Sequence, residues 1–178
     1  MTMRIVVLES SPHQNGASNT LATFFIRGAQ EAGHTVEILD VAHMDLHPCI
    51  GCFRGKNVGH CVVRDDMRHI EQVLATADLM VWVTPVYFYD MSAQLKIVID
   101  RLHCFYGNLP GKKLLLLATA WREDEEVMAY LEGLYHALAD YLGCQDLGAI
   151  LARGCGSPET ICANQYAAQA YQMGKSIR

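Results

Sequence analysis

Short apolar runs alternate with longer amphipathic segments along this chain. The first run, residues 5–8, is continuous and mostly β-branched, which is typical of a strand covered on both faces. Residues 21–32 then place apolar side chains at helical spacing, with Ser18 or Asn19 as the expected N-cap and Gly33 as the stop. We therefore expect a buried strand, a polar loop and a helix in succession.

The same alternation continues to the end of the chain. Ser92 is the expected N-cap of one helix, and Asp65 and Asp66 begin another. We predict further strands at residues 34–40, 77–84, 114–119 and 145–151, and helices at residues 67–76, 93–105, 123–142 and 158–174. Five strand and helix alternations predict an α/β fold, a doubly wound sheet of five parallel strands with helices on both faces, in a single domain over residues 1–178.

In open sheets of this kind the ligand lies beyond the carboxyl ends of the strands, so the loops at residues 10–20, 85–92 and 119–123 should converge. The first loop precedes a helix N-terminus, where free N–H groups and the helix dipole favour an anion. It carries neutral hydrogen-bonding side chains, from Ser10, Ser11, Ser18, Asn19 and Thr20. One interpretation is a phosphate monoester held by neutral donors; the other is that these residues only form a turn and a cap.

The other two loops supply apolar and aromatic side chains. The loop at residues 85–92 offers Pro85, Tyr87, Phe88, Tyr89 and Met91. This loop and the loop at residues 10–20 together indicate a ligand with a phosphate tail and a large flat ring. Trp121 follows the strand at 114–119 and is expected either to close over the ring or to pack at a subunit interface. The phosphate loop has neither the Walker A nor the G-x-G-x-x-G spacing, so bound ATP or a dinucleotide in a Rossmann crevice is not expected.

Composition excludes several classes of function. The 178 residues are 51% hydrophobic and 19% charged, as in soluble globular proteins. The net charge of −5 argues against a nucleic-acid partner. The longest apolar runs, residues 114–118 and 79–83, are too short to span a bilayer, and no leader pattern begins the chain, so we expect a cytoplasmic protein without a membrane partner. Seven cysteines, an odd number, favour reduced thiols over a disulfide framework.

Three sets of residues, in order along the chain, resemble the motifs of a known protein family. They are Ser11-Pro12 with Ser18-Asn19-Thr20, then Cys49-Ile-Gly-Cys52 followed by Cys61 to Met67, and Thr84-Pro85-Val86-Tyr87 continued by Met91 to Lys96 and Ile99-Asp100-Arg101. With them the chain resembles the flavodoxin-like NAD(P)H-dependent FMN oxidoreductases, which include FMN reductases, quinone reductases and iron–sulfur flavoproteins. The motifs cover residues 4 to about 106. The last third is similar only in its pattern of elements.

The resemblance implies a three-layer flavodoxin-like fold that binds FMN non-covalently. It places the FMN phosphate on Ser11, Ser18, Asn19 and Thr20, and the ring against Pro85, Val86, Tyr87 and Phe88, with Met91 and Trp121 as further cofactor-binding residues. NADPH or NADH is the implied co-substrate, and a small quinone, flavin, nitro or azo compound is the implied electron acceptor. No catalytic side chain is needed, because FMN carries the hydride chemistry. A homodimer or homotetramer is also implied.

Two other functions stay open at this point. One is a flavodoxin-type electron carrier that binds FMN but has no nicotinamide reaction of its own. The other is a non-catalytic module that has lost the cofactor, because a fold does not fix a function. Departures from the family pattern support the second: Ser10 and Tyr89 stand where the family usually has glycine, and His13 where it often has arginine.

The cysteines between residues 49 and 61 raise the question of a metal. The iron–sulfur flavoproteins carry four cysteines in this connection, and here Gly55 stands in the third place. A cubane cluster needs four thiolates, so with only Cys49, Cys52 and Cys61 we predict no cluster and no metal. A redox-active Cys49/Cys52 pair and a zinc ion bound with the help of His60 are alternatives, but we favour buried thiols in a relic loop.

Overall fold

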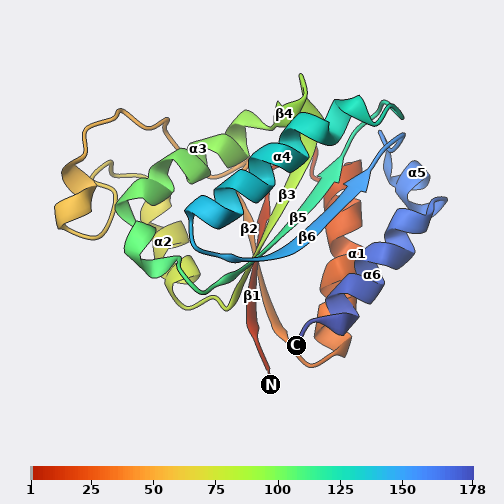
Figure 1. Ribbon diagram of the computed structural model, residues 1–178, viewed down its shortest axis with the longest axis horizontal. Helices are drawn as coiled ribbons and strands as arrows, with labels where there is room; N and C mark the ends of the chain where they lie inside the picture. Colours follow the sequence, from red (N-terminus) through yellow and green to blue (C-terminus); the bar gives the residue numbers. More distant parts are fainter. Residues whose placement is uncertain (1) are drawn as a thin grey trace.

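The computed structural model describes residues 2–178, and within them the strands form a six-stranded sheet. The strands are β1 (Arg4–Glu9), β2 (Thr35–Asp40), β3 (Leu79–Tyr87), β4 (Asp90–Met91), β5 (Lys113–Thr119) and β6 (Gln145–Ala152). Their order is β2-β1-β3-β5-β6, all paired in parallel, while the short β4 pairs with β3 in the antiparallel sense (Figure 1). The five parallel strands follow the flavodoxin-like order, which confirms the predicted fold class.

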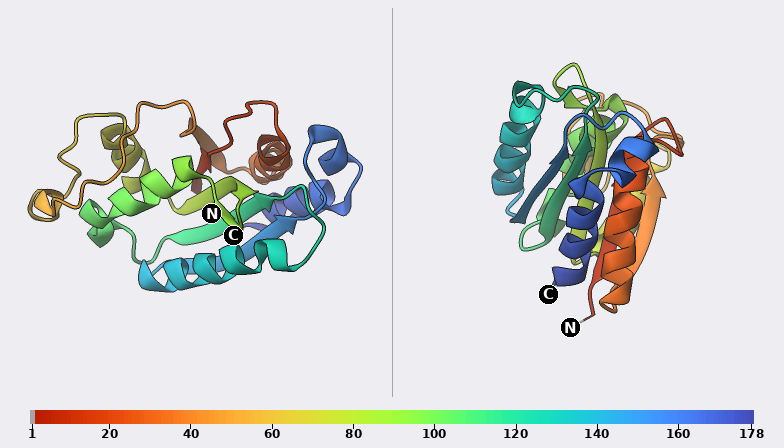
Figure 2. Two further views of the ribbon diagram at one scale, coloured as in Figure 1. Left: turned by 90° about the horizontal axis from the view of Figure 1, so that it is seen from above. Right: turned by 90° about the vertical axis from the view of Figure 1, so that its right-hand side faces the viewer.

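Helices cover both faces of the sheet. One layer contains α1 (Ala17–Glu31), α5 (Pro158–Cys162) and α6 (Gln165–Ser176), and the other contains α2 (Met67–Ala75), α3 (Ala93–Arg101) and α4 (Glu126–Tyr141). Figure 2 shows α4 on one side of the sheet and α1 with α6 on the other. Strand β1 contributes side chains to the cores on both faces of the sheet. Val6 and Leu8 belong to the core on the α2–α4 side, and Ile5 and Val7 belong to the core on the α1–α6 side.

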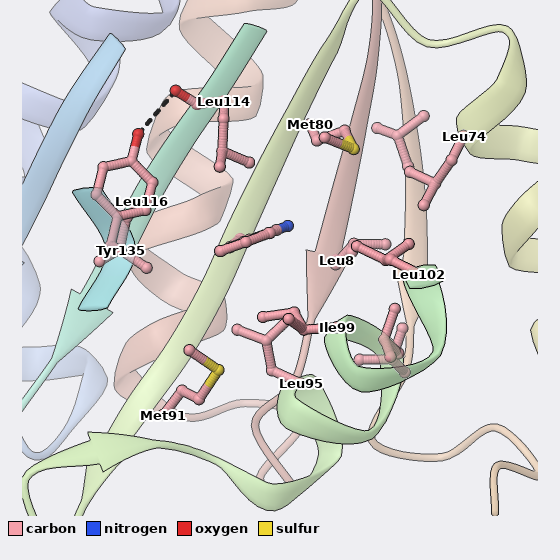
Figure 3. Close-up of a cluster of buried hydrophobic side chains, with 14 of the residues drawn as sticks. Leu8, Leu74, Met80, Met91, Leu95, Ile99, Leu102, Leu114, Leu116 and Tyr135 are labelled. Atoms are coloured by element: carbon pink, nitrogen blue, oxygen red, sulfur yellow. Dashed lines mark hydrogen bonds between the residues drawn. The ribbon is translucent and has the colours of Figure 1, made fainter. Parts of the chain in front are cut away.

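The core on the α2–α4 side is built from large side chains (Figure 3). Trp82 and Tyr135 are both fully buried, and their rings meet edge to face with centroids 6.2 Å apart. The Tyr135 hydroxyl donates to the Leu114 carbonyl at 2.8 Å and lies 2.7 Å from Asp146 Oδ1, so its polar end is satisfied inside the protein. Met91 is part of the same core.

Helices α1 and α6 lie in direct backbone contact. A Cβ added at Gly28 of α1 would stand 2.1 Å from the Tyr171 carbonyl oxygen, and one added at Gly174 of α6 would stand 2.1 Å from the Phe25 carbonyl oxygen. Both positions therefore need glycine. In the part of the chain that the structure describes, no helix is long and apolar enough to cross a membrane.

Several predicted boundaries were wrong. Helix α1 begins at Ala17 with Gly16 as its N-cap, so Ser18 and Asn19 lie inside the first turn. The predicted loop at residues 85–92 is a hairpin, because β3 continues to Tyr87 and the chain returns as β4. The predicted helix at 158–174 is two helices, since Asn164 interrupts it and accepts a hydrogen bond from the Gln165 N–H at 2.7 Å, as an N-cap does.

Candidate functional site

A cleft of about 530 Å³ opens at the carboxyl ends of the parallel strands. Residues from the loop after β1 form one wall, the end of β3 forms a second, and Thr119, Trp121 and residues 155–158 form the rest. The cleft therefore brings together six of the residues that the sequence places at a cofactor site: Ser11, Ser18, Pro85, Val86, Tyr87 and Trp121. It has the position that open α/β sheets give to a ligand.

The N-terminus of α1 meets this cleft at Gly16, Ala17 and Ser18. Gly16 is the N-cap and supplies no side-chain hydrogen bond, so the N–H groups of the first turn keep their capacity to donate. A Cβ at Gly16 would stand 2.9 Å from the His13 carbonyl oxygen, which explains why the loop turns on a glycine here. No lysine or arginine lines the cleft among residues 2–178, so neutral donors and the helix dipole supply its affinity for an anion.

Two hydroxyl groups lie beside this helix end. Ser11 Oγ accepts a hydrogen bond from the His13 N–H at 3.2 Å. Ser18 Oγ lies 2.7 Å from Thr119 Oγ1, which ties the helix to the end of β5. Thr119 was not singled out from the sequence, although a hydroxyl residue at the end of a predicted strand was a usable signal.

The other two predicted phosphate residues do not line the cleft. Thr20 Oγ1 donates to the Gly16 carbonyl at 2.9 Å, a bond back onto its own helix. Asn19 Nδ2 donates to the Gln14 carbonyl at 3.2 Å, while its Oδ1 is buried without a hydrogen-bond partner in the described residues. Both side chains therefore support the shape of the loop in this structure.

The hairpin of β3 and β4 forms the apolar wall. Pro85, Val86 and Tyr87 line the cleft, but Phe88 at the tip is fully exposed. The tip residues Phe88 and Tyr89 both have a positive φ, 48° and 68°, as a two-residue hairpin turn requires. That requirement explains why glycine is suited to position 89, where this chain has tyrosine.

A buried group of hydroxyls holds the strand ends below the cleft. Ser10 Oγ donates to the Val83 carbonyl at 2.7 Å, and Ser92 Oγ donates to Ser10 Oγ at 2.8 Å. The Ser92 N–H donates in turn to Thr84 Oγ1 at 2.9 Å, and Ser92 Oγ caps α3 by accepting from the Leu95 N–H, as predicted. Ser10 thus joins β1, β3 and α3 and is fully buried. It does not line the cleft.

Trp121 stands at the rim of the cleft, and 83% of its surface is exposed. Its Cδ1 atom lies 2.7 Å from where a Cβ at Gly156 would stand, so the indole rests on that glycine. The segment 155–158 was missed from the sequence. Ser157-Pro158 was nevertheless a helix-start signature directly after the last predicted strand.

Comparison with known proteins bears on this geometry. The profile of the family described as NADPH-dependent FMN reductase matches residues 3–156. The chain belongs to this family. The matched region includes β1 to β6 and every segment of the cleft except Ser157 and Pro158.

Relatives of this FMN reductase family chain include proteins named iron–sulfur flavoproteins. One from Methanocaldococcus jannaschii is 34% identical over 99 residues, which cover 56% of this chain and 51% of that protein. Another, from Archaeoglobus fulgidus, is 26% identical over 140 residues, covering 76% of this chain and 63% of that protein. The chain therefore matches about half to two thirds of the length of these relatives.

Solved structures with the same fold include flavin-dependent reductases. An NAD(P)H:quinone oxidoreductase from Methanothermobacter marburgensis superposes with a TM-score of 0.78 at 17% identity, covering 98% of this chain and 96% of that one. An FMN-dependent NADH-azoreductase from Bacillus anthracis, solved in complex with FMN, superposes with a TM-score of 0.72 at 15% identity, covering 98% of both chains. At these identities the likeness concerns the fold.

The cleft of this FMN reductase family member fits FMN. Its volume lies in the range of small-ligand sites, roughly 300–1,000 Å³. An uncapped helix N-terminus at one end suits a phosphate, and Pro85, Val86 and Tyr87 offer an apolar surface for a flat ring. FMN is the cofactor of the family.

Proposed function

We propose that this protein is an FMN-dependent NAD(P)H oxidoreductase that passes two electrons from NADPH or NADH to a small-molecule acceptor. The observation that carries the proposal is the cleft itself, which joins the uncapped N-terminus of α1 to the apolar wall of the β3–β4 hairpin. Bound FMN would accept a hydride from the nicotinamide and pass two electrons to the acceptor.

The residues of the cleft would bind and orient rather than exchange protons. The N–H groups at the start of α1, with Ser11 and Ser18, would hold the phosphate as neutral donors. Pro85, Val86 and Tyr87 would fix the ring plane and keep water from one side of it. Trp121, exposed at the rim, would cover the open side where nicotinamide and acceptor alternate.

The acceptor we propose is a quinone, flavin, nitro or azo compound. Solved neighbours named quinone oxidoreductase and azoreductase share the fold and support this range of flat, electron-poor acceptors. The exposed aromatic side chains around the cleft, at Tyr87, Phe88 and Trp121, provide stacking surfaces for such molecules. A homodimer or homotetramer stays a prediction.

The first test is an absorbance titration of the purified protein with FMN, followed by anaerobic addition of NADPH or NADH. We expect FMN to remain bound through gel filtration and its visible absorbance to bleach with one of the two nicotinamides. A protein that holds FMN but is not bleached by either would be an electron carrier. A protein that does not hold FMN would refute the proposal.

A further inference from the structure

Arg122 places a positive charge beside the mouth of the FMN cleft. It directly follows Trp121, which stands at the rim, and 54% of its side chain is exposed. Its Nη1 donates a long hydrogen bond to the Tyr89 hydroxyl, at 3.4 Å. The side chain therefore reaches from the loop after β5 to the tip of the β3–β4 hairpin, while no lysine or arginine lines the cleft itself among residues 2–178.

The guanidinium of Arg122 is only partly engaged by the protein. Its Nε donates to Asp124 Oδ2 at 2.8 Å, and its Nη2 makes no hydrogen bond within residues 2–178. The Asp124 side chain is also exposed, and exposed ion pairs of this kind contribute little stability. Arg122 therefore keeps both charge and hydrogen-bond donors for a ligand that is more strongly anionic than a carboxylate.

The acidic run at residues 123–126 leaves this guanidinium with one counter-charge. Asp124 is the carboxylate paired with it in the described part of the chain. Glu125 pairs instead with Arg153, at 3.2 Å, and Glu126 lines a separate groove beside the hairpin tip. An anion that displaces Asp124 would therefore meet a guanidinium with no second carboxylate bound to it.

Tyr89 is held in position for its contact with Arg122. Its φ of 68° is strained for a residue other than glycine, and such strain persists where the surroundings fix it. The ring meets Tyr130 of α4 edge to face, with centroids 6.0 Å apart, and β4 lies against α4 at this end of the sheet (Figure 1). A glycine at position 89 would be unstrained but would supply neither the ring contact nor the hydroxyl.

The proposed co-substrate carries the anion that suits this position. Every nicotinamide dinucleotide has a pyrophosphate, and NADPH has a 2′-phosphate in addition. The nicotinamide has to enter the cleft to reach FMN, so the phosphates of the dinucleotide stay outside it. Arginine is well suited to phosphate, because its planar fork donates two parallel charge-assisted hydrogen bonds. The FMN phosphate does not need Arg122, because the N-terminus of α1 offers neutral donors to it.

We propose that Arg122, positioned by Tyr89, binds a phosphate group of NADPH or NADH at the mouth of the FMN cleft. This assignment rests on the proposed function and names the residue that determines affinity for the co-substrate. Arg122 would bind the dinucleotide away from its reacting atoms, so its loss should raise KM and leave kcat unchanged.

The first test is isothermal titration of the FMN-loaded protein with NADP⁺ and with NAD⁺, which does not depend on turnover. We expect Arg122→Leu to raise the Kd of one or both nucleotides about tenfold, the effect of losing a charge-assisted hydrogen bond. A rise for NADP⁺ alone would identify the 2′-phosphate as the bound group, and a rise for both would identify the pyrophosphate. Arg27→Leu is the matched control, because Arg27 is also exposed and paired, with Glu31 at 3.0 Å, but lies outside the cleft.

Two variants separate direct binding from a structural effect. Asp124→Asn removes the counter-charge and should lower the Kd about twofold to threefold, opposite in sign to Arg122→Leu. Tyr89→Phe keeps the ring but removes the hydroxyl, so it should raise KM for the nicotinamide about threefold without changing kcat. The proposal is overturned if the wild type binds neither nucleotide, if Arg122→Leu binds both as tightly as the wild type, or if Asp124→Asn binds neither more tightly.

Anaerobic addition of NADPH or NADH to the same samples distinguishes the two proposals. If FMN is bleached equally well in the wild type and in Arg122→Leu at every nucleotide concentration, the oxidoreductase function stands and the role of Arg122 is refuted. If the wild type binds NADP⁺ or NAD⁺ through Arg122 but its FMN is not bleached by either reduced nucleotide, the binding site stands and the oxidoreductase function is refuted.

Discussion

The hydroxyl oxygens of Ser18 and Thr119 lie 2.7 Å apart, and they join the first turn of α1 to the last residue of β5. Each hydroxyl can donate one hydrogen bond, and the pair uses only one proton between them. If Thr119 is the donor, the proton of Ser18 remains free to point into the cleft. Thr119 therefore fixes the position of a hydroxyl that we assign to the FMN phosphate.

We predict that Thr119→Val, which keeps the shape and removes the hydroxyl, weakens FMN binding about fivefold to tenfold, because one hydrogen bond contributes about 1 kcal/mol. Flavin fluorescence titration measures this. Thr76→Val is the matched control, since Thr76 makes a similar local bond, to the Val73 carbonyl, at the end of α2 and outside the cleft. An unchanged FMN Kd in Thr119→Val would show that the hydroxyl pair is only structural.

A substitution at the tip of the β3–β4 hairpin should stabilise the protein. Phe88 has a φ of 48° and is fully exposed, so its left-handed backbone is strained and its ring buries no surface. Asparagine tolerates this conformation. We expect Phe88→Asn to raise the free energy of unfolding by about 1 kcal/mol, measured by urea denaturation.

The control for this prediction is Val58→Asn. Val58 is also an exposed apolar residue, but its φ of −112° carries no such strain. An equal gain in both variants would mean that lower surface hydrophobicity, rather than relief of the backbone, causes the effect.

Asp65, just before α2, and Arg101, the last residue of α3, form a buried ion pair that makes the loop between β2 and α2 sensitive to acid. Burial alone would raise the pKa of Asp65, but hydrogen bonds from Arg101 and from the N–H groups of His47 and Met67 outweigh it and lower the pKa to about 2. Because the native state holds this carboxylate ionised, its stabilisation is present above the ordinary pKa of 3.8 and disappears as the pH falls through about 2.

We expect Asp65→Asn to be less stable than the wild type by about 3 kcal/mol at pH 6, because it leaves Arg101 buried without its counter-charge. The difference should shrink as the pH falls from about 5 to about 2. Urea denaturation over this range measures it. The exposed pair of Arg27 and Glu31 supplies the control, and Glu31→Gln should cost little at any pH. A difference for Asp65→Asn that does not depend on pH would contradict the assignment.

Glu9 is expected to titrate near neutral pH. It lies at the end of β1 beside Asp40 of β2, and burial first, then the charge of Asp40, raises its pKa to about 7. The native state therefore binds this proton more tightly than the unfolded chain does. The stabilisation is complete below the ordinary pKa of 4.5 and is lost as the pH rises through about 7.

We predict that Glu9→Gln abolishes the loss of stability that the wild type shows as the pH rises through about 7. The variant should be more stable than the wild type by roughly 1–3 kcal/mol at pH 8, and the difference should vanish near pH 4.5. Glu37→Gln on β2 is the control, because the Glu37 side chain is 43% exposed and pairs only loosely with Arg4, 3.9 Å away. Parallel pH profiles for Glu9→Gln and the wild type would refute the prediction.

The parallel strands of the sheet could be predicted because the evidence for them is local. Residues 79–83 and 114–118 are uninterrupted apolar runs, and strands buried on both faces in a parallel sheet have this pattern. The hairpin could not be predicted in the same way, because Phe88 and Tyr89 are residues that rarely adopt a positive φ. The pairing of β3 with β4 overrides their local preference.

The site was predictable only where its residues are adjacent in sequence. Ser11, Ser18 and residues 85–87 belong to motifs, so they were found and do line the cleft. Thr119 acts through a contact with Ser18, which is distant in the chain, and no spacing rule connects such partners. Met91 was assigned to the ring site from its neighbours, but the hairpin turns it into the core, where 5% of it is exposed.

The glycine contact between α1 and α6 has a consequence for synthesis of the chain on the ribosome. The helix whose first turn meets the FMN cleft packs through Gly28 against residues 165–176, which are translated more than a hundred residues later. Until they emerge, the outer face of α1 lacks its partner, and the apolar surface around Phe25 and Ala29 stays open to chaperones or to aggregation. The nascent chain therefore completes the packing of α1 only after residues 165–176 have been translated.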